Sequence, residues 1–233
     1  MSAEPHLTDV LITSRPLANY LDFFGLTSAD LAGQRILDCP GGASSFTAEA
    51  RALGADSIAL DPTYGKAPTE FAGIGRDQIA LSDDWFRSNP QLFLPAGRGD
   101  ANISAIIAAR HHALDLFLSD YENEPERYVA GQLPFLPFPD ESFDLVLSSH
   151  LLFTYADRFD RDFHLAGILE LLRVSAGEVR IYPLSDYLGI TAPWFDDLIA
   201  ELRHLAVGVT IAPVVFRVTR SWTTQLILKP QTL

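Results

Sequence analysis

The sequence predicts an α/β domain built around a doubly wound sheet. Two apolar runs, residues 35–38 and 57–61, each end in an aspartate, and a segment of helical composition, residues 45–53, lies between them. A further apolar run, residues 143–148, ends in a polar cluster. This pattern is typical of a buried strand that ends at a functional site. In doubly wound sheets the ligand lies across the carboxyl ends of the strands, so we expect the site there.

The turn after the first strand points to a ligand site. Pro40, Gly41, Gly42 and Ser44 make it a turn of mostly small residues, and its glycines let a ligand approach the backbone. The following helix is expected to aim its free N–H groups and positive dipole end at the ligand.

The acid at the end of the first strand separates two classes of cofactor. A dinucleotide site needs G-x-G-x-x-G and an acid about twenty positions later. Here Asp38 already ends the strand, where it would repel a pyrophosphate but could accept a hydrogen bond from an ammonium group. A nicotinamide-dependent oxidoreductase is therefore disfavoured, and S-adenosyl-L-methionine, which carries an amino group and a sulfonium, fits.

At these residues the sequence resembles the class I S-adenosylmethionine-dependent methyltransferases. Asp38 and Gly42 align with the first motif of that superfamily, D-x-G-x-G-x-G, while Pro40 and Ser44 replace its first and last glycines. The segment 136–150, LPFPDESFDLVLSSH, is similar to the stretch L-P-F-x-D-x-S-F-D-x-V that enters the fourth strand of these enzymes. This second resemblance is the most specific in the chain.

The resemblance implies a Rossmann-like sheet of seven strands, mostly parallel with an antiparallel last strand. It implies contacts to the cofactor from Asp38, Pro40, Gly41, Gly42, Ser44, Asp61, Pro62, Gln132, Leu133 and Ser149. Asp61 is expected to accept hydrogen bonds from both ribose hydroxyls, although an Asp before Pro also opens many solvated turns. Gln132 stands where the superfamily often has Asp, and its carbonyl oxygen can accept from the adenine amino group.

Two regions are expected to cover the sheet ends. Residues 1–34 form an N-terminal helical cap, with an amphipathic helix over 16–24 and a short capped turn over 27–31. Arg15 and Tyr20 of this cap are possible cofactor contacts, but a salt-bridged surface arginine and a packed tyrosine are favoured.

Residues 64–127 are too long for a structureless loop and predict a helical, lid-like insert between strands 2 and 3. Residues 102–121 have a helical pattern, and residues 83–93 are rich in aromatic side chains. A lid or substrate wall is favoured over a purely structural insert. It could present Arg110, His111, His112 or Tyr121, and at most one of the adjacent histidines could face a shared site.

The rest of the chain completes the predicted fold. A helix through residues 165–172, a fifth strand over 177–184 that ends at Pro183, and a helix over 194–205 follow. Residues 214–217 and 223–229 are expected to form a closing hairpin. The ending E-V-R-I-x-P-L, together with S-H-L-L-F before it, is similar to a little-characterised bacterial branch of the superfamily.

His150 is the candidate general base for methyl transfer. It follows the fourth strand, and its ordinary pKa near 6.5 suits a base at neutral pH. The alternative is that it hydrogen-bonds the loop or packs over the cofactor. Tyr155 is the second catalytic candidate; weaker ones are Asp157, His164, Tyr182 and Asp186. The enzyme would mainly align acceptor, methyl and sulfur, and remove a proton where the acceptor carries one.

The composition limits which functions and locations we expect for the chain. The chain has 233 residues, of which 48% are hydrophobic, enough for the core of a single domain over 1–233. One cysteine, Cys39, excludes an intramolecular disulfide, no run has zinc-site spacing, and the sequence suggests neither a signal peptide nor a membrane span. We therefore expect no metal and a cytoplasmic location.

A net charge of −13 with only two lysines argues against a nucleic-acid substrate. The predicted function is methyl transfer to a small-molecule acceptor. The alternatives are a non-catalytic S-adenosylmethionine-binding sensor or scaffold, and a protein methyltransferase. The oligomeric state is left open.

Overall fold

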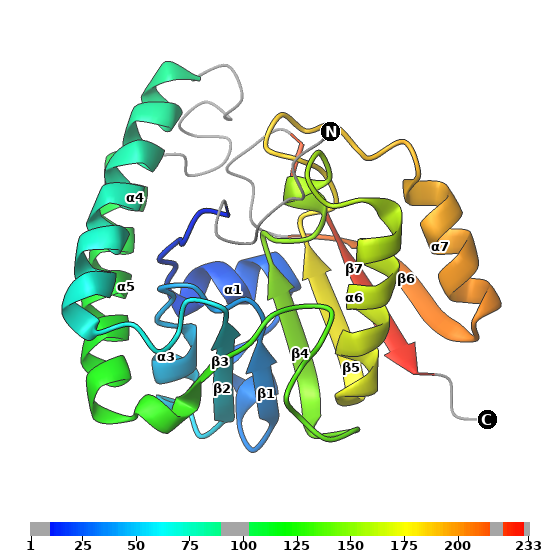
Figure 1. The fold of residues 1–233 in the computed structure, drawn as a ribbon, viewed down its shortest axis with the longest axis horizontal. Helices are drawn as coiled ribbons and strands as arrows, with labels where there is room; N and C mark the ends of the chain where they lie inside the picture. The colour runs from blue at the N-terminus through cyan, green and yellow to red at the C-terminus, as the bar shows by residue number, and fades with distance from the viewer. Residues whose placement is uncertain (1–9, 90–102, 215–220, 231–233) are drawn as a thin grey trace.

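The computed structural model describes residues 10–89, 103–214 and 221–230. Seven strands form one sheet in the order β3-β2-β1-β4-β5-β7-β6 (Figure 1). They are β1 Arg35–Asp38, β2 Asp56–Asp61, β3 Tyr128–Ala130, β4 Phe143–Ser149, β5 Ser175–Tyr182, β6 Val207–Pro213 and β7 Thr224–Pro230. β1 to β5 pair in parallel, and β7 runs antiparallel to both of its neighbours. The predicted doubly wound, Rossmann-like fold is confirmed.

Helices cover both faces of the sheet (Figure 1). On one face, apolar residues of α1 and α3 pack against Leu145 and Leu147 of β4, whereas Val146 packs on the other face with α6 and α7. Because β4 is buried on both sides, its sequence is an almost continuous apolar run. These four helices are α1 Leu17–Phe24, α3 Phe46–Ala52, α6 Arg161–Arg173 and α7 Phe195–His204.

The N-terminal turn is capped as its sequence predicts. The short helix α2, Ser28–Leu31, begins at Thr27, whose backbone N–H and hydroxyl both bond the Asp30 carboxylate. This reciprocal capping satisfies donors that a helix start leaves free.

The insert between β2 and β3 contains two long helices, α4 Pro68–Ser88 and α5 Ile103–Asn123, which pack together beside β3 (Figure 1). Their contact with the sheet is aromatic: Tyr64, Phe71, Phe117, Tyr121 and Tyr128 form one buried cluster. The helix predicted over residues 102–121 is confirmed from residue 103. Within the predicted aromatic-rich stretch, α4 continues to Ser88, and residues 90–93 lie outside the described residues.

The closing hairpin exists, but its first strand was predicted too late in the chain. β6 ends at Pro213 and pairs with β7 from Val207 opposite Pro230 to Pro213 opposite Thr224. Val207, Val209 and Ile211 alternate with smaller residues, a period-two pattern that the prediction overlooked. Residues 215–217 of the predicted strand lie outside the described residues.

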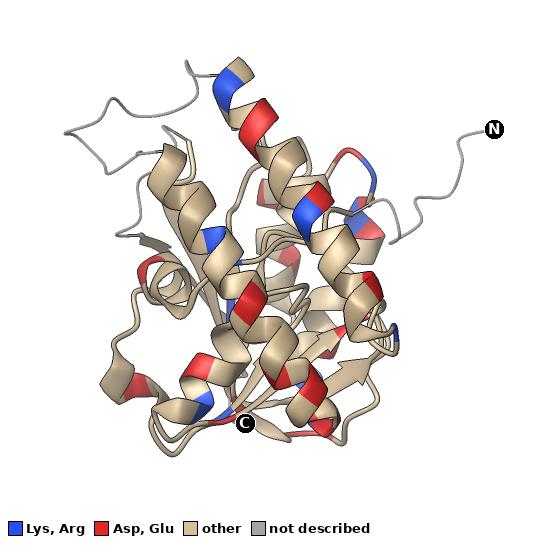
Figure 2. Ribbon diagram, turned by 90° about the vertical axis from the view of Figure 1, so that its left-hand side faces the viewer, with Lys and Arg blue, Asp and Glu red and all other residues tan. Residues whose placement is uncertain are grey.

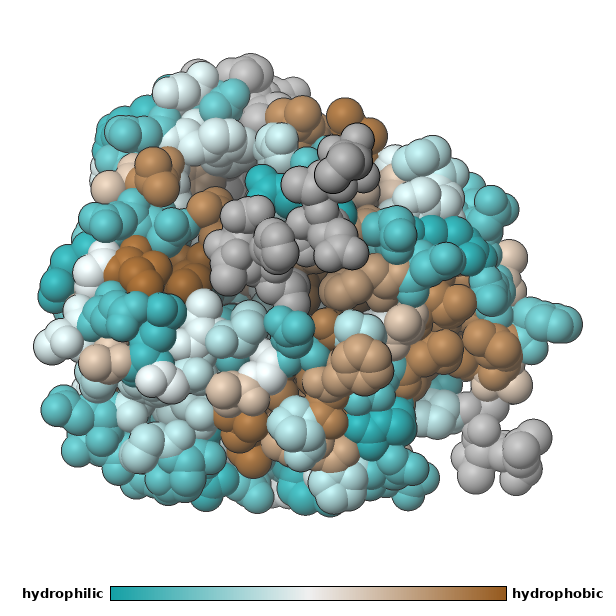
Figure 3. Space-filling view, viewed as in Figure 1, coloured by the Kyte–Doolittle hydropathy of each residue, from teal (hydrophilic) through white to brown (hydrophobic). Residues whose placement is uncertain are grey.

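The surface on the side of α6 and α7 is largely hydrophilic, with apolar side chains gathered in a few places (Figure 3). Leu169 of α6 and Phe135, before β4, are among the exposed large apolar residues. In the described ranges, none of the helices has the length and apolarity that crossing a bilayer requires.

Candidate active site

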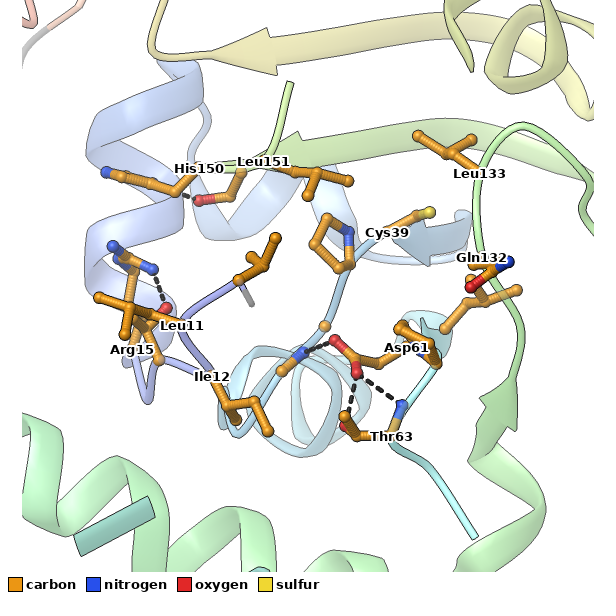
Figure 4. A pocket seen from close by; sticks show the side chains of 18 of the residues that line it. Leu11, Ile12, Arg15, Cys39, Asp61, Thr63, Gln132, Leu133, His150 and Leu151 are labelled. Carbon is orange, nitrogen blue, oxygen red and sulfur yellow. Dashed lines mark hydrogen bonds between the residues drawn. The ribbon is translucent and has the colours of Figure 1, made fainter. Parts of the chain in front are cut away.

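A pocket lies at the carboxyl ends of β1, β2, β3 and β4 (Figure 4). The strand order reverses between β1 and β4, and ligands of doubly wound sheets bind at this switch point. The N-terminal segment 10–16, called the strap below, forms the remaining wall through Val10, Leu11, Ile12, Thr13 and Arg15.

Eight of the ten predicted cofactor contacts line this pocket. They are Pro40, Gly41, Gly42, Asp61, Pro62, Gln132, Leu133 and Ser149. The other two, Asp38 and Ser44, lie behind the wall. Asp38 is buried and accepts hydrogen bonds of 2.9 and 3.2 Å from the Tyr20 hydroxyl, which itself lines the pocket. Burial raises the pKa of Asp38 well above its ordinary value.

The backbone N–H groups of the glycine turn are not free, whereas the expectation for the helix that follows it stays a prediction. Every backbone donor from residue 41 to residue 45 has a partner inside the protein. Those bonds run from Gly41 to the Leu60 oxygen, from Gly42 to Asp61, from Ala43 to the Thr13 oxygen, from Ser44 to the Gly41 oxygen and from Ser45 to the Arg15 oxygen. Two of the five partners belong to the strap. A ligand therefore finds no free backbone donor in this turn.

Two glycines are needed for the close packing of this turn. A Cβ on Gly41 would lie 2.5 Å from the Tyr64 hydroxyl, which donates a 2.9 Å hydrogen bond to the Gly42 oxygen. Gly42 has a φ of +55°, and a Cβ there would lie 3.1 Å from the Thr13 oxygen. The turn, the insert and the strap are therefore packed directly on one another.

Asp61 is held in place within the pocket (Figure 4). Its Oδ1 accepts hydrogen bonds from the Thr63 N–H at 2.9 Å and hydroxyl at 2.5 Å, and its Oδ2 accepts one from the Gly42 N–H at 3.1 Å. Burial raises the pKa of this carboxyl, and these hydrogen bonds oppose that shift. Because a carboxylate oxygen accepts about two hydrogen bonds, Oδ2 keeps one free position for a ligand.

Arg15 lines the pocket with its side chain buried, at 8% exposure. Its guanidinium donates to the Thr13 hydroxyl, and within the described residues it forms no salt bridge. Burial lowers its pKa. The sequence had favoured a salt-bridged arginine at the surface, and this prediction was wrong. Arg15 is buried because the strap crosses the end of the sheet, which the local sequence pattern does not predict. The packing of Tyr20 is confirmed by its contacts with Phe23, Phe24 and Phe46.

His150 lies in the pocket wall after β4, on the same side as Arg15 (Figure 4). Its φ is +54°, its N–H donates to the Tyr182 oxygen at 2.7 Å, and its Nδ1 lies 2.8 Å from the Ser149 hydroxyl. Burial, and then the positive charges of Arg15 and Arg110, lower its pKa well below the ordinary value. The imidazole is therefore neutral at neutral pH, as a general base must be.

The other candidates lie outside the pocket wall. The Tyr155 hydroxyl accepts a 3.0 Å hydrogen bond from the N–H of Leu11, so it holds the strap. His164 is buried against Trp194, Asp186 accepts hydrogen bonds from its own loop, and Asp157 is exposed. His111 and His112 are both exposed, and the Tyr121 hydroxyl bonds the backbone of Gly65 and Lys66. The described ranges contain no cluster of three metal-ligating side chains.

Comparison with known proteins agrees with this architecture. No protein-family model matches the chain. The sequence is 26% identical over 200 residues to an uncharacterised protein of Methanocaldococcus jannaschii, covering 85% of this chain and 88% of that protein.

Solved structures provide the comparison of folds. Magnesium protoporphyrin IX methyltransferase from Synechocystis, solved with bound S-adenosylmethionine, superposes with a TM-score of 0.50, 12% identity, and coverage of 92% of this chain and 78% of that chain. A proposed RNA methyltransferase from Pyrococcus horikoshii has a TM-score of 0.49, 11% identity, and coverage of 92% and 85%.

The chain thus has the Rossmann-like fold of the class I S-adenosylmethionine-dependent methyltransferases, with the pocket at the switch point of its sheet. Its relative from Methanocaldococcus jannaschii is archaeal, and the resemblance to a bacterial branch stays a prediction.

Proposed function

We propose that the protein transfers a methyl group from S-adenosylmethionine to a small-molecule acceptor. The observation that carries this proposal is the pairing, in one pocket, of the Asp61 carboxylate with the buried Arg15 guanidinium (Figure 4). The free position on Asp61 suits a ribose hydroxyl of the cofactor, and Arg15 suits its carboxylate, because both contacts are charge-assisted hydrogen bonds.

The remaining wall residues fit the other parts of the same cofactor. The side chains of Gln132 and Leu133 would hold the adenine, the first by a hydrogen bond and the second by apolar contact. Tyr20, which lines the pocket and whose hydroxyl donates to Asp38, would accept a hydrogen bond from the ammonium group. When bound, the cofactor supplies a methyl group whose bond to sulfur breaks as the acceptor bonds it, leaving the electron pair on sulfur.

His150 would take the proton that the acceptor loses. If its Nδ1 donates to the Ser149 hydroxyl, its Nε2 has a free lone pair to accept that proton and pass it to solvent. Its positive φ is a strained conformation for a residue with a side chain, and such strain is frequent at functional sites.

The acidic surface of the insert and the segments that cover the pocket favour a small acceptor over a nucleic acid. The strap forms one wall of the pocket, and we assign the insert helices α4 and α5 the role of a lid beside it. The outer face of these helices carries more acidic than basic residues (Figure 2). Over their whole length the two helices carry the acids Glu70, Asp77, Asp83, Asp84, Asp115, Asp120 and Glu122, against the basic residues Arg76, Arg87 and the inward Arg110. Phosphates would be repelled from most of this surface.

Isothermal titration with S-adenosylmethionine, S-adenosylhomocysteine and NADH tests the proposal, after a check for copurified cofactor. Micromolar binding of the two adenosyl ligands without NADH binding is expected, and it would justify a screen of acceptors. Binding without turnover of any acceptor would favour the sensor or scaffold alternative. No binding by folded, empty protein would overturn both.

A further inference from the structure

On the pocket side formed by Arg15 and the neutral His150, Arg15 contributes a positive charge, in a protein whose net charge is −13. Seven arginines of the described part form salt bridges with Asp or Glu: Arg35, Arg51, Arg87, Arg127, Arg161, Arg173 and Arg180. Across the same ranges, Arg15 and Arg110 form none. In the described part of the chain, Arg15 and Arg110 are thus two cations without acid partners, and Arg15 lines the pocket.

Arg110 occupies an inward position on α5. Ile107, Leu114, Phe117 and Tyr121 share its helical spacing of three or four residues. The last three belong to the apolar cluster between the insert and the sheet, and Ile107 packs against it. Ile12, a residue of the pocket wall, packs against that cluster as well. The stripe on α5 thus reaches the pocket wall, and Arg110 interrupts it with a charge.

The residues around Arg110 keep its side chain in this inward position but do not neutralise its charge. Its guanidinium carbon lies 5.1 Å from the centre of the Phe86 ring, and the side chain is half-buried. Burial, and then the charge of Arg15, lower the pKa of Arg110 to about 9. Arg110 and Arg15 in turn both lower the pKa of His150, which places the three groups within electrostatic range of one another. A partly buried cation beside another cation is costly unless an anion joins it.

The cofactor cannot neutralise both arginines. It has one carboxylate, assigned above to Arg15, and its ammonium and sulfonium groups add positive charge. We propose that the methyl acceptor is an anionic small molecule and that Arg110 binds its carboxylate or phosphate group, with the acceptor atom beside His150. This inference rests on the proposed function. It explains why α5 carries an arginine at an inward position, since a guanidinium matches either anion by paired hydrogen bonds.

The test titrates protein saturated with S-adenosylhomocysteine with three probes: benzoate, phenylphosphonate and the neutral benzamide. We expect at least one of the two anions to bind saturably and benzamide not to bind. Arg110→Gln should weaken anion binding about tenfold or more, as expected for loss of a charged hydrogen bond, and leave the affinity for S-adenosylhomocysteine unchanged. Tighter binding of benzoate or of phenylphosphonate decides between a carboxylate and a phosphate.

Arg76→Gln is the matched control, because Arg76 lies exposed on α4 and forms no salt bridge within the described part of the chain. It should leave anion binding unchanged. Equal binding of benzamide and benzoate, absence of saturable anion binding, or an unchanged anion affinity in Arg110→Gln would each overturn the inference. Loss of S-adenosylhomocysteine binding by the unmodified protein would instead overturn the proposed function, so the two failures are distinguishable.

Discussion

The Gly42 N–H donates a hydrogen bond of 3.1 Å to the Asp61 Oδ2, which ties the turn after β1 to the acid after β2 (Figure 4). The same carboxylate holds Thr63 through its other oxygen. Asp61 therefore organises both loops on which the adenosyl part of a ligand would rest. Its remaining acceptor position is oriented by three existing hydrogen bonds, which reduces the cost of ordering it on binding.

Asp61→Asn should weaken binding of S-adenosylhomocysteine by about 1–3 kcal/mol, the scale for loss of a charge-assisted hydrogen bond. The measurement is isothermal titration of the folded variant. Asp56→Asn is the control, since Asp56 begins the same strand, is exposed and pairs with Arg127 far from the pocket. Equal affinities in the two variants would exclude the ribose contact.

Gly42→Ala should lower the free energy of unfolding by more than Gly33→Ala does. Both glycines have positive φ, which costs a residue with a Cβ about 1–2 kcal/mol. Only at Gly42 would the Cβ also press on the Thr13 oxygen; at Gly33 it would meet nothing within 4 Å. Urea unfolding of both variants measures the difference. Equal losses in the free energy of unfolding would mean that the strap moves away from the added Cβ and does not constrain the turn.

His150→Asn should flatten the dependence of stability on pH in acid. The folded-state pKa of His150 lies below its unfolded value near 6.5, so its contribution to stability is complete above that value and falls as the pH drops toward the folded pKa. Asparagine tolerates the positive φ at this position. The free energy of unfolding is measured from about pH 7 downward, with the exposed His112→Asn as control. Parallel curves for His150→Asn and the unmodified protein would contradict the lowered pKa.

Tyr155→Phe should loosen the strap, because it removes the hydroxyl that accepts the Leu11 N–H. We expect faster hydrogen exchange at the Leu11 amide and a loss of stability of about 0.5–1.5 kcal/mol, as for one hydrogen bond. Tyr128→Phe removes a hydroxyl bonded to Asp120 instead and should leave that exchange rate unchanged. Unchanged exchange at Leu11 together with lost turnover would restore a catalytic role for Tyr155.

Local patterns were sufficient to predict the parts of the site that follow directly on strands. The apolar run before Asp61 predicts a buried strand, and a parallel sheet brings such strand ends to one edge. Ser149 and His150 were predicted in the same way, whereas Gln132 was predicted from the family resemblance, and all three line the pocket. Asp38 follows this logic too, but its carboxylate turns to Tyr20, a partner supplied by a helix eighteen residues earlier.

The sequence by itself determined the order of strands and helices and the positions at which acids end strands, because apolar periodicity and turn residues act over a few neighbouring residues. Only the tertiary structure decided that the strap occupies the N–H groups of the glycine turn, that Arg15 is buried, and that Arg110 rather than His111 or His112 faces inward. These outcomes depend on which distant segments pack together. The inward position of Arg110 shares the helical spacing of Ile107 and Leu114, but burial and hydrogen-bond competition are set by contacts between distant segments, which no local pattern predicts.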